Sequence, residues 1–536
     1  MEPFTLEAHP DLTPSVMSGL AWYYWLAALA NAAAASYIAY GTMVMEGASR
    51  EGLLPQSRRM PKWLLQVVGL FFVLAIAVMT LHLAFGESST VIAYYLCAIG
   101  TAVLAIQSAA DAAAHSDPHA NGHGHGDGNG HKPSLDDHIP AIGIGPAMSR
   151  TRWAIIWAIC SVIFQVMGIV YVHGNPVAFP SLFKDAIDWV SGPTTFFVGA
   201  TLAFAALIRY RKTFVNGIFA WGLVNVTLLY FGLSLTDYDF RDIVVKPDNV
   251  PITGMMVLVG YFTWLSLRRA VINDARMARG LPNLEELEPE KTLTWPDLVY
   301  TELIAMVALT IVLIVWSIAL QAPLEQPASS TVAPNPAKAP WYFLGLQEML
   351  VYFDPWMAGV WLPTLIIIGL MAIPYIDTNK QGNGYYTYEQ RKFAYITFQY
   401  GFLVLWVVLI LLGTFLRGPN WNFFGPYEYW SHSKLIPLNN VNLSDIFWVD
   451  ILGTSKPTNF LVRELPGIIL VLAYMVLTPL LLVPFFKGYI KEAGWGRYAM
   501  LSFLLLFLAS LPIKMVLRWT LNLKYLVYMR EIFFNI

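Results

Sequence analysis

Long, uninterrupted runs of apolar residues are the feature that most restricts how this chain can fold. A helix needs about 20 mostly apolar residues to cross the roughly 30 Å hydrocarbon layer of a bilayer, and runs of that length occur about twelve times in the chain. In lipid, only helices and closed barrels satisfy every backbone N–H and C=O group, and runs this long fit helices. The sequence therefore predicts an all-α, polytopic integral membrane protein with about twelve transmembrane helices.

The composition agrees with a surface that mostly faces lipid. Of the 536 residues, 57% are hydrophobic and 13% are charged, whereas a soluble globule carries about a quarter charged residues. The net charge of −2 offers no positive field for phosphate, so no nucleic-acid partner is expected. The two cysteines, Cys97 and Cys160, lie inside apolar runs, and there is no C-x-x-C-H sequence. A disulfide framework, a thiolate-bound iron–sulfur cluster and covalent c-type haem are therefore excluded.

Basic residues in the short loops give the expected orientation of the chain. The predicted spans lie near 18–45, 62–85, 89–111, 152–173, 193–212, 214–236, 252–272, 296–321, 356–377, 394–416, 465–486 and 497–517. Lysine and arginine collect after the odd-numbered spans, for example Arg58, Arg211, Arg276, Lys392 and Lys491. Because such residues mark cytoplasmic loops, the sequence predicts a multi-pass protein of the bacterial inner (cytoplasmic) membrane with both termini on the outer, periplasmic side.

The sequence divides into two expected modules. Residues 1–290 form an amino-terminal membrane module of about seven spans, with a His-rich cytoplasmic loop at 112–150. Residues 291–536 form a module of about five spans with long outer loops at 322–355 and 417–464. The His-rich loop invites a metal-binding interpretation, but its Gly, Asn and Asp content favours a solvated linker, so no metal site is predicted.

The most informative segment runs from Pro334 to Glu348 and reads PNPAKAPWYFLGLQE. It follows the eighth span and precedes the ninth, at the predicted outer face. Together with its flanking helices, over about residues 290–425, it resembles the carboxyl-terminal domain of cytochrome b, the part that chloroplast-type quinol-oxidising complexes carry as a separate small subunit. An aromatic belt at the water–lipid boundary is the alternative interpretation, since Trp and Tyr collect there in any membrane protein.

The resemblance implies a quinone site with particular residues. In that family a P-E-W-Y motif lines the outer quinol-oxidation pocket, and here Pro340, Trp341, Tyr342 and Phe343 would hold a quinone, menaquinone or ubiquinone. Pro340 stands where the family has a glutamate that is thought to accept a quinol proton. Glu348, seven residues after Trp341, is the expected substitute and the candidate catalytic residue.

Besides Pro340, a second difference from the family is expected in the residues that bind haem. Cytochrome b proper holds two b haems between paired histidines in its amino-terminal half. Here six of the ten histidines lie in the 112–150 loop, and only His82 and His173 lie near predicted membrane helices. A four-histidine bundle is excluded. Two interpretations stay open: one shared haem between His82 and His173, or two interfacial histidines bonded to backbone carbonyls, with haem b on a partner subunit.

These observations predict a non-autonomous membrane subunit of a respiratory quinol/quinone oxidoreductase complex. Electrons would leave through a haem- or iron–sulfur-bearing partner: a cytochrome b amino-terminal half, a Rieske-type protein or a multihaem cytochrome c. A redox-silent scaffold that anchors such partners is the first alternative, and a secondary transporter is the second. Lys514, near the outer end of the last span, is expected to extend to water.

Overall fold

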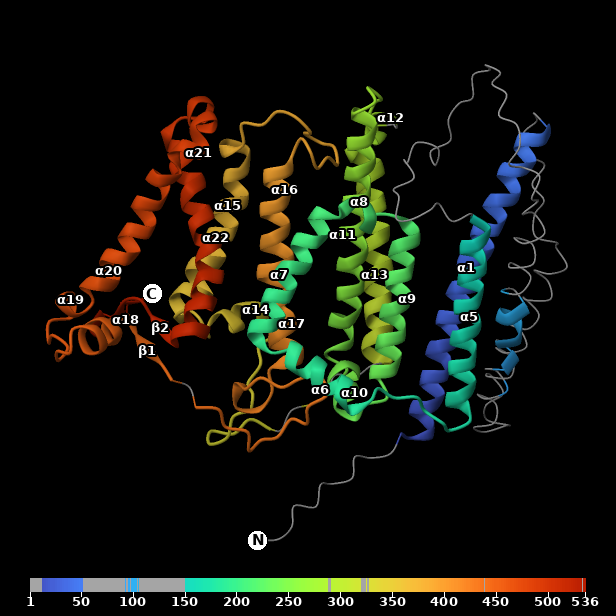
Figure 1. Ribbon diagram of the computed structural model, residues 1–536, viewed down its shortest axis with the longest axis horizontal. Helices are drawn as coiled ribbons and strands as arrows, with labels where there is room; N and C mark the ends of the chain where they lie inside the picture. The colour runs from blue at the N-terminus through green and yellow to red at the C-terminus, as the bar shows by residue number, and fades with distance from the viewer. Residues whose placement is uncertain are drawn as a thin grey trace, which may run out of the picture. The chain divides into compact units, whose positions relative to one another are not determined.

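The computed structural model describes residues 12–51, individual positions between 92 and 105, 150–287, 291–319, 324, 327–437, 439–532 and 534–536. Almost all of the regular structure in these residues is helical (Figure 1), which confirms the all-α membrane prediction. The predicted spans at 62–85 and at most of 89–111, and the His-rich loop, lie outside the described residues.

Eight of the described helices are long and apolar enough to cross a membrane. They are Arg152–Val172, Gly217–Ser234, Val250–Met277, Thr294–Ala319, Trp356–Ile376, Lys392–Leu416, Leu465–Ala493 and Trp495–Leu521. Each overlaps a predicted span. The predicted span at 193–212 appears as α7 (Pro193–Arg209), joined to α6 (Ser181–Val190) at a bend of 80°, and this pair would be a ninth span or a re-entrant segment. Helix α1 (Pro14–Glu51) covers the predicted span 18–45 but is not among the eight.

The remaining elements connect these helices or extend them. Within the spans are α5 (Arg150–Val172), α9 (Gly217–Ser234), α11 (Val250–Met277), α13 (Val299–Ala319), α15 (Leu362–Ile376), α16 (Lys392–Gln399), α17 (Val408–Leu411), α20 (Leu465–Leu472), α21 (Thr478–Ala493) and α22 (Trp495–Leu521). Between them lie α8 (Arg211–Phe214), α10 (Tyr238–Val245), α12 (Leu284–Leu287), α14 (Trp341–Met349), α18 (Leu443–Asp445) and α19 (Phe460–Arg463). Short π-helical or 3₁₀ stretches are Thr294–Leu298, Trp356–Trp361, Tyr400–Val407, Leu412–Leu416, Pro419–Trp421, Ile446–Ile451, Ala473–Leu477 and Arg530–Ile532.

Two very small sheets complete the described structure. Strand β1 (Val441–Asn442) pairs in parallel with β2 (Leu523–Tyr525). Strand β3 (Tyr528–Met529) pairs antiparallel with β4 (Phe534–Asn535). Both lie in segments that follow or connect spans, so they organise loops rather than a core.

The described helices form two compact units, and the first contains Met1–Lys184 and Lys212–Asp242. In this unit α1 packs against α5 and α9. A Cβ atom at Gly232 of α9 would lie 2.7 Å from the Tyr24 hydroxyl oxygen, so glycine permits the close approach of α9 to α1. The amide cluster (Asn31, Trp221 and Asn225) links the same two helices: Asn31 Nδ2 donates to Asn225 Oδ1, and Trp221 Nε1 donates to Asn31 Oδ1.

The second unit contains Asp185–Arg211 and Ile243–Ile536. Its core consists of apolar side chains from α14, the span Lys392–Leu416 and α22, with α7 packed against them. Phe197 of α7 contacts the Trp519 ring edge-on, and Phe204 contacts Tyr400. Helices from both predicted modules therefore contribute to this unit, and the division of the sequence at residue 290 stays a prediction.

Polar contacts join the loops of the second unit at the two ends of its helices. At one end Arg211 pairs with Glu389, and Tyr489 donates to the Ile376 carbonyl. At the other end Asn335 and Asn420 bond to each other. The loops predicted to be cytoplasmic thus lie at one end and those predicted to be outer at the other; which end faces the cytoplasm stays a prediction.

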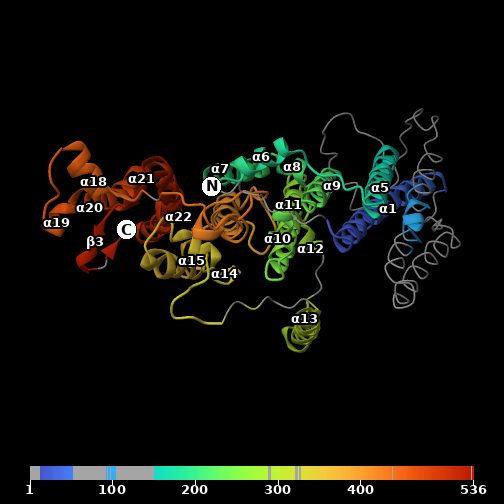
Figure 2. The ribbon, with the colours of Figure 1, turned by 90° about the horizontal axis from the view of Figure 1, so that it is seen from below.

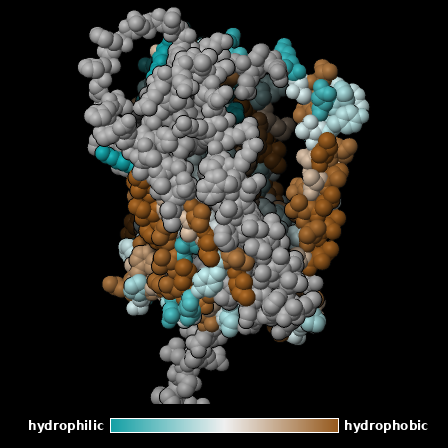
Figure 3. All heavy atoms as spheres, turned by 90° about the vertical axis from the view of Figure 1, so that its right-hand side faces the viewer, coloured by the Kyte–Doolittle hydropathy of each residue, from teal (hydrophilic) through white to brown (hydrophobic). Residues whose placement is uncertain are grey.

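On the face shown in Figure 3, hydrophobic residues cover the middle of the visible helices and hydrophilic residues lie toward their ends.

Candidate functional site

The predicted quinone-binding residues lie together at the start of α14. Pro340 is the residue before the helix, and Trp341, Tyr342 and Phe343 form its first turn. Their side chains are 37%, 49% and 50% exposed, which in a membrane leaves them open to lipid or a ligand. The Tyr342 and Phe343 ring centroids are 4.7 Å apart, and the Trp341 ring meets Tyr342 edge-on at 5.6 Å. The structure thus places an open aromatic surface where the sequence predicts one.

Gln347 fixes the chain that leads into this aromatic turn. Its Oε1 accepts a hydrogen bond from the Ala339 backbone N–H at 2.8 Å, and its Nε2 donates to the Ala337 carbonyl at 2.9 Å. Proline at 340 lacks an N–H and holds a narrow range of φ, which suits the residue that precedes a helix. Gln347 therefore ties the two residues Ala337 and Ala339, just before Pro340, to the helix that carries the aromatic turn.

The opposite face of α14 packs against the span Lys392–Leu416, and Figure 2 shows α14 beside it. Two glycines permit this contact. A Cβ at Gly413 would lie 3.2 Å from the Leu344 carbonyl oxygen, and a Cβ at Gly345 would lie 3.3 Å from Ile410 Cγ1. Since interiors are close-packed, larger residues there would push the two helices apart.

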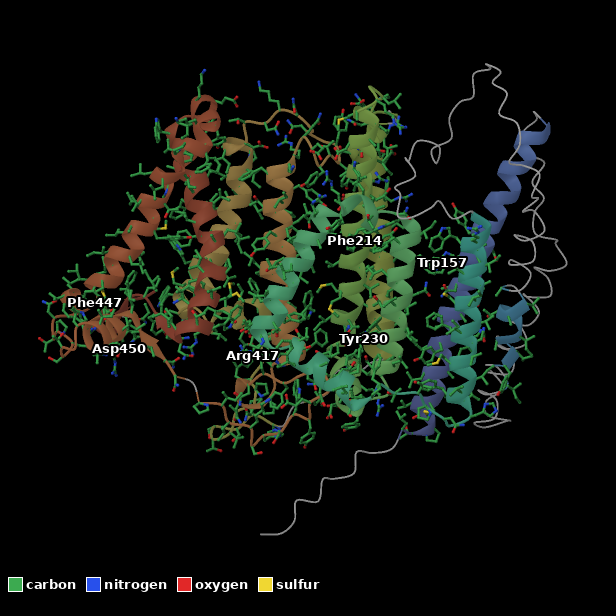
Figure 4. All side chains as sticks on the ribbon, viewed as in Figure 1. Trp157, Phe214, Tyr230, Arg417, Phe447 and Asp450 are labelled. Atoms are coloured by element: carbon green, nitrogen blue, oxygen red, sulfur yellow. The ribbon has the colours of Figure 1, made fainter. Side chains whose placement is uncertain are left out.

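Glu348 and Arg417 form a buried ion pair on this packed face. Arg417 Nε donates to Glu348 Oε2 at 2.9 Å, and Nη2 donates to Oε1 at 2.7 Å. Glu348 is fully buried and Arg417 is 8% exposed. Arg417 follows directly after the span, at the end that carries the loop 417–440 (Figure 4). A guanidinium that binds both oxygens stabilises the ionised carboxylate, so the candidate catalytic residue is already engaged by a cation.

The Arg417 guanidinium makes two further contacts that orient it. Its Nη1 donates to the Trp421 carbonyl at 2.9 Å, and its Cζ lies 3.9 Å from the centre of the Phe423 ring. Asn420 and Trp421, in the turn that supplies this carbonyl, both have positive φ, near 57° and 56°. Residues other than glycine rarely adopt this backbone conformation. The hydrogen bonds of Asn420 to Asn335 and to the His432 carbonyl hold the turn in place.

Lys338 completes the charged cluster (Lys338, Glu348 and Arg417). Its Nζ donates to the Thr414 carbonyl at 2.9 Å and lies 4.8 Å from the centre of a Trp430 ring. Burial lowers the pKa of Lys338 to about 7; Lys246 and Arg417 also lower it, while Asp248 and Glu348 raise it. An amine with this pKa exchanges protons near neutral pH, which an ordinary lysine does not.

Comparison with protein families assigns the segment that contains this site. Residues 327–425 match the family model described as Cytochrome b(C-terminal)/b6/petD. The matched residues include the aromatic turn and all three members of the charged cluster. Comparisons with curated proteins and with solved structures gave no match. The match confirms the resemblance to the carboxyl-terminal domain of cytochrome b, and with the membrane helices it indicates a membrane subunit of a cytochrome bc-type electron-transfer complex.

The predicted haem between His82 and His173 stays untested, because His82 lies outside the described residues. His173 directly follows α5 and is exposed; its Nδ1 lies 2.9 Å from the Ile169 carbonyl oxygen, and the Tyr95 hydroxyl is 3.3 Å away. No group of three or more potential metal ligands occurs among the described residues. His173 therefore shows the contacts of an interfacial histidine, and its possible pairing with His82 on a haem stays a prediction.

Sequence reasoning missed Arg417 and Lys338 as members of the site. The sequence did offer a signal for both residues. Lys338 and Arg417 are charged residues in the two predicted outer loops, and both lie in the cytochrome b-like region. Their partners could not be predicted from the sequence. Arg417 is 69 residues from its partner Glu348, and Lys338 is 76 residues from its partner Thr414. Lys514 was also predicted wrongly: it is 2% exposed and donates to the Lys524 carbonyl instead of extending to water.

Proposed function

We propose that this chain is the quinol-binding membrane subunit of a respiratory oxidoreductase complex, with the quinone ring held against Trp341, Tyr342 and Phe343. The observation that carries the proposal is the coincidence of the family match with the open aromatic turn. An aromatic surface suits the flat, apolar ring of a menaquinol or ubiquinol, and the Tyr342 hydroxyl can donate to a quinone oxygen.

In this proposal the chain binds and orients the quinol, and partner subunits carry the electrons. A cytochrome b amino-terminal half, a Rieske-type protein or a multihaem cytochrome c would supply the haem or iron–sulfur acceptor. The outer loops 322–355 and 417–464 are the proposed docking surfaces, and exposed apolar side chains such as Leu435 and Ile451 suit a protein partner. The proposed location is the bacterial inner membrane, with these loops on the periplasmic side.

The proton-accepting role of Glu348 stays a prediction, and its ion pair sets a condition on that role. Protonating the carboxylate would weaken the two charge-assisted hydrogen bonds from Arg417, so a proton bound by Glu348 would disturb the ion pair. In the resting geometry the ion pair of Glu348 with Arg417 positions α14 against the span Lys392–Leu416.

A redox-silent scaffold is the second candidate function. Two observations favour it. Pro340 stands where the family has a titratable glutamate, and Glu348, the next carboxylate along the chain, already forms an ion pair with Arg417. A scaffold would keep the helices and the docking loops but would neither bind nor oxidise quinol.

Quinol turnover by the intact complex separates these two functions. For the quinol oxidoreductase we expect extractable quinone in the purified complex, and Trp341→Ala should lower turnover about tenfold or more through loss of ring contact. Trp495→Ala is the matched control, because Trp495 is also an exposed aromatic at a helix start but lies outside the cytochrome b-like segment. Wild-type turnover in Trp341→Ala, or a complex without quinone and without turnover, would reject the proposal.

A further inference from the structure

Lys338 is placed between the aromatic turn and the end of a membrane span. It precedes Trp341 by three residues, while its Nζ reaches the Thr414 carbonyl in the last turn of Lys392–Leu416. Carbonyls at a helix carboxyl end carry partial negative charge and attract a cation. The amine is therefore held at the end of this span, on a residue that lies three positions before the aromatic turn in the chain.

The charged groups around Lys338 leave it without a carboxylate partner among the described residues. Glu348 binds Arg417, and Asp248, from the loop between α10 and α11, pairs with Lys246 at 3.6 Å. Glu428 pairs with Lys434. A partly buried ammonium next to two cations, with only one carbonyl bond, is poorly stabilised in its charged form. The same causes lower the pKa of Lys338 to about 7.

Two buried polar atoms beside Lys338 have hydrogen-bonding capacity to spare. Trp430 Nε1 and Thr414 Oγ1 make no hydrogen bond to other described residues. Trp430 is the residue whose ring lies against the Lys338 ammonium, and Thr414 supplies its carbonyl bond. Unpaired buried polar atoms are costly unless a ligand or water completes them. The Trp430 N–H and the Thr414 hydroxyl can therefore form hydrogen bonds with an oxygen-bearing ligand.

We propose that the Lys338 amine accepts the first proton of the bound hydroquinone, a role that rests on the proposed function. The hydroquinone O–H bond breaks, the proton binds the lone pair of the neutral Nζ, and an ammonium forms. The two electrons pass one at a time to a haem or iron–sulfur one-electron acceptor on a partner subunit, and the second proton goes to water. Lys338 then releases its proton to water at the same end of the helices and returns to the neutral form.

This assignment differs from the carboxylate chemistry predicted for Glu348. A neutral amine accepts a proton without disturbing an ion pair, whereas a proton bound by Glu348 would weaken its charge-assisted hydrogen bonds from Arg417. Only the deprotonated amine acts as a base, so turnover should rise with pH through about 7 and level off above it.

The test is the pH profile of quinol oxidation by the intact purified complex, with a water-soluble short-chain quinol as the probe. Lys338→Arg retains the positive charge but cannot deprotonate, so it should lower turnover about a hundredfold and abolish the rise near pH 7. Lys338→Met should do the same. Lys487→Met is the control, since Lys487 is an exposed lysine of α21 outside the site and outside both proposed docking loops, and it should leave the profile unchanged.

Trace acetylation of the wild-type complex between pH 5 and 11, quantified at Lys338 by mass spectrometry, gives a readout that does not depend on any variant. Half-maximal labelling near pH 7 supports the proposal, and half-maximal labelling near pH 10 overturns it. If wild type oxidises quinol and Lys338→Arg keeps its rate and pH rise, the Lys338 role is wrong and the proposed function stands. If the wild-type complex neither binds quinone nor oxidises quinol, the proposed function fails, and the Lys338 role fails with it.

Discussion

The two units of the protein bury polar side chains of different kinds. In the first unit, the amide cluster joins α1 to α9 with neutral groups: Asn31, Asn225 and the Trp221 indole. In the second unit, the charged cluster lies where α14 meets the end of the span Lys392–Leu416 and contains a lysine, an arginine and a carboxylate. The amide cluster is fully neutral at any physiological pH, whereas the charged cluster holds a group that titrates near neutrality.

Under the proposed function, this difference separates a region that holds helices together from a region that would perform chemistry. Neutral amides give modest hydrogen bonds without the large cost of placing charge inside lipid. Buried charges are retained at a cost, and in membrane proteins they usually mark functional sites. The charged cluster lies inside the cytochrome b-like segment and the amide cluster outside it.

The largest expected effect comes from breaking the ion pair. Arg417→Met leaves the Glu348 carboxylate buried and uncompensated, which should lower the free energy of unfolding by about 3–5 kcal/mol. The measurement is the thermal transition of the detergent-solubilised protein, followed by tryptophan fluorescence. The double variant Glu348→Gln with Arg417→Gln should recover much of this loss. A double variant no more stable than Arg417→Met would show that the pair is not the source of the effect.

A smaller effect is expected from the helix contact behind the ion pair. At Gly413, an added methyl group would meet the Leu344 backbone carbonyl at 3.2 Å. Gly413→Ala should therefore destabilise the second unit by about 1–3 kcal/mol. Gly359→Ala is the matched control in a neighbouring span, since nothing lies within 4 Å of its added Cβ. Equal thermal transitions for the two variants would contradict the close packing of α14.

The smallest effect is expected in the amide cluster. Asn31→Leu removes the bonds to Asn225, Trp221 and the Ala27 carbonyl. Such bonds between membrane helices contribute on average about 0.6 kcal/mol each and at most about 1.7. The same thermal measurement should show a smaller shift than Arg417→Met and no change in the pH profile of turnover. A loss as large as that of Arg417→Met would remove the distinction between the two clusters.

The sequence was sufficient to predict the spans because their signal is local. All eight candidate spans overlap predicted ones, since about 20 apolar residues in a row determine a membrane helix without reference to the rest of the chain. The bend between α6 and α7 was not predicted: α6 is short and amphipathic, and its ten residues carry no span-length signal.

The site was predictable only in its local part. The aromatic turn could be found because Trp341, Tyr342 and Phe343 are consecutive, and because Trp341 and Tyr342 match the W-Y half of the motif that the resemblance supplied. The charged cluster could not, because Lys338, Glu348 and Arg417 meet through tertiary packing that depends on Gly345 and Gly413. No periodicity in the sequence links residues so far apart. From the sequence alone, Glu348 beside an aromatic segment is therefore interpreted as an unpaired base, because its partner Arg417 cannot be identified.

Photoaffinity labelling of the intact complex with an azido-quinone tests the central claim most directly. If the aromatic turn receives the quinone ring, the label should attach to the peptide that contains Trp341, Tyr342 and Phe343, and excess unlabelled quinone should prevent the attachment. Competable labelling confined to another part of the chain or to a partner subunit would contradict the account.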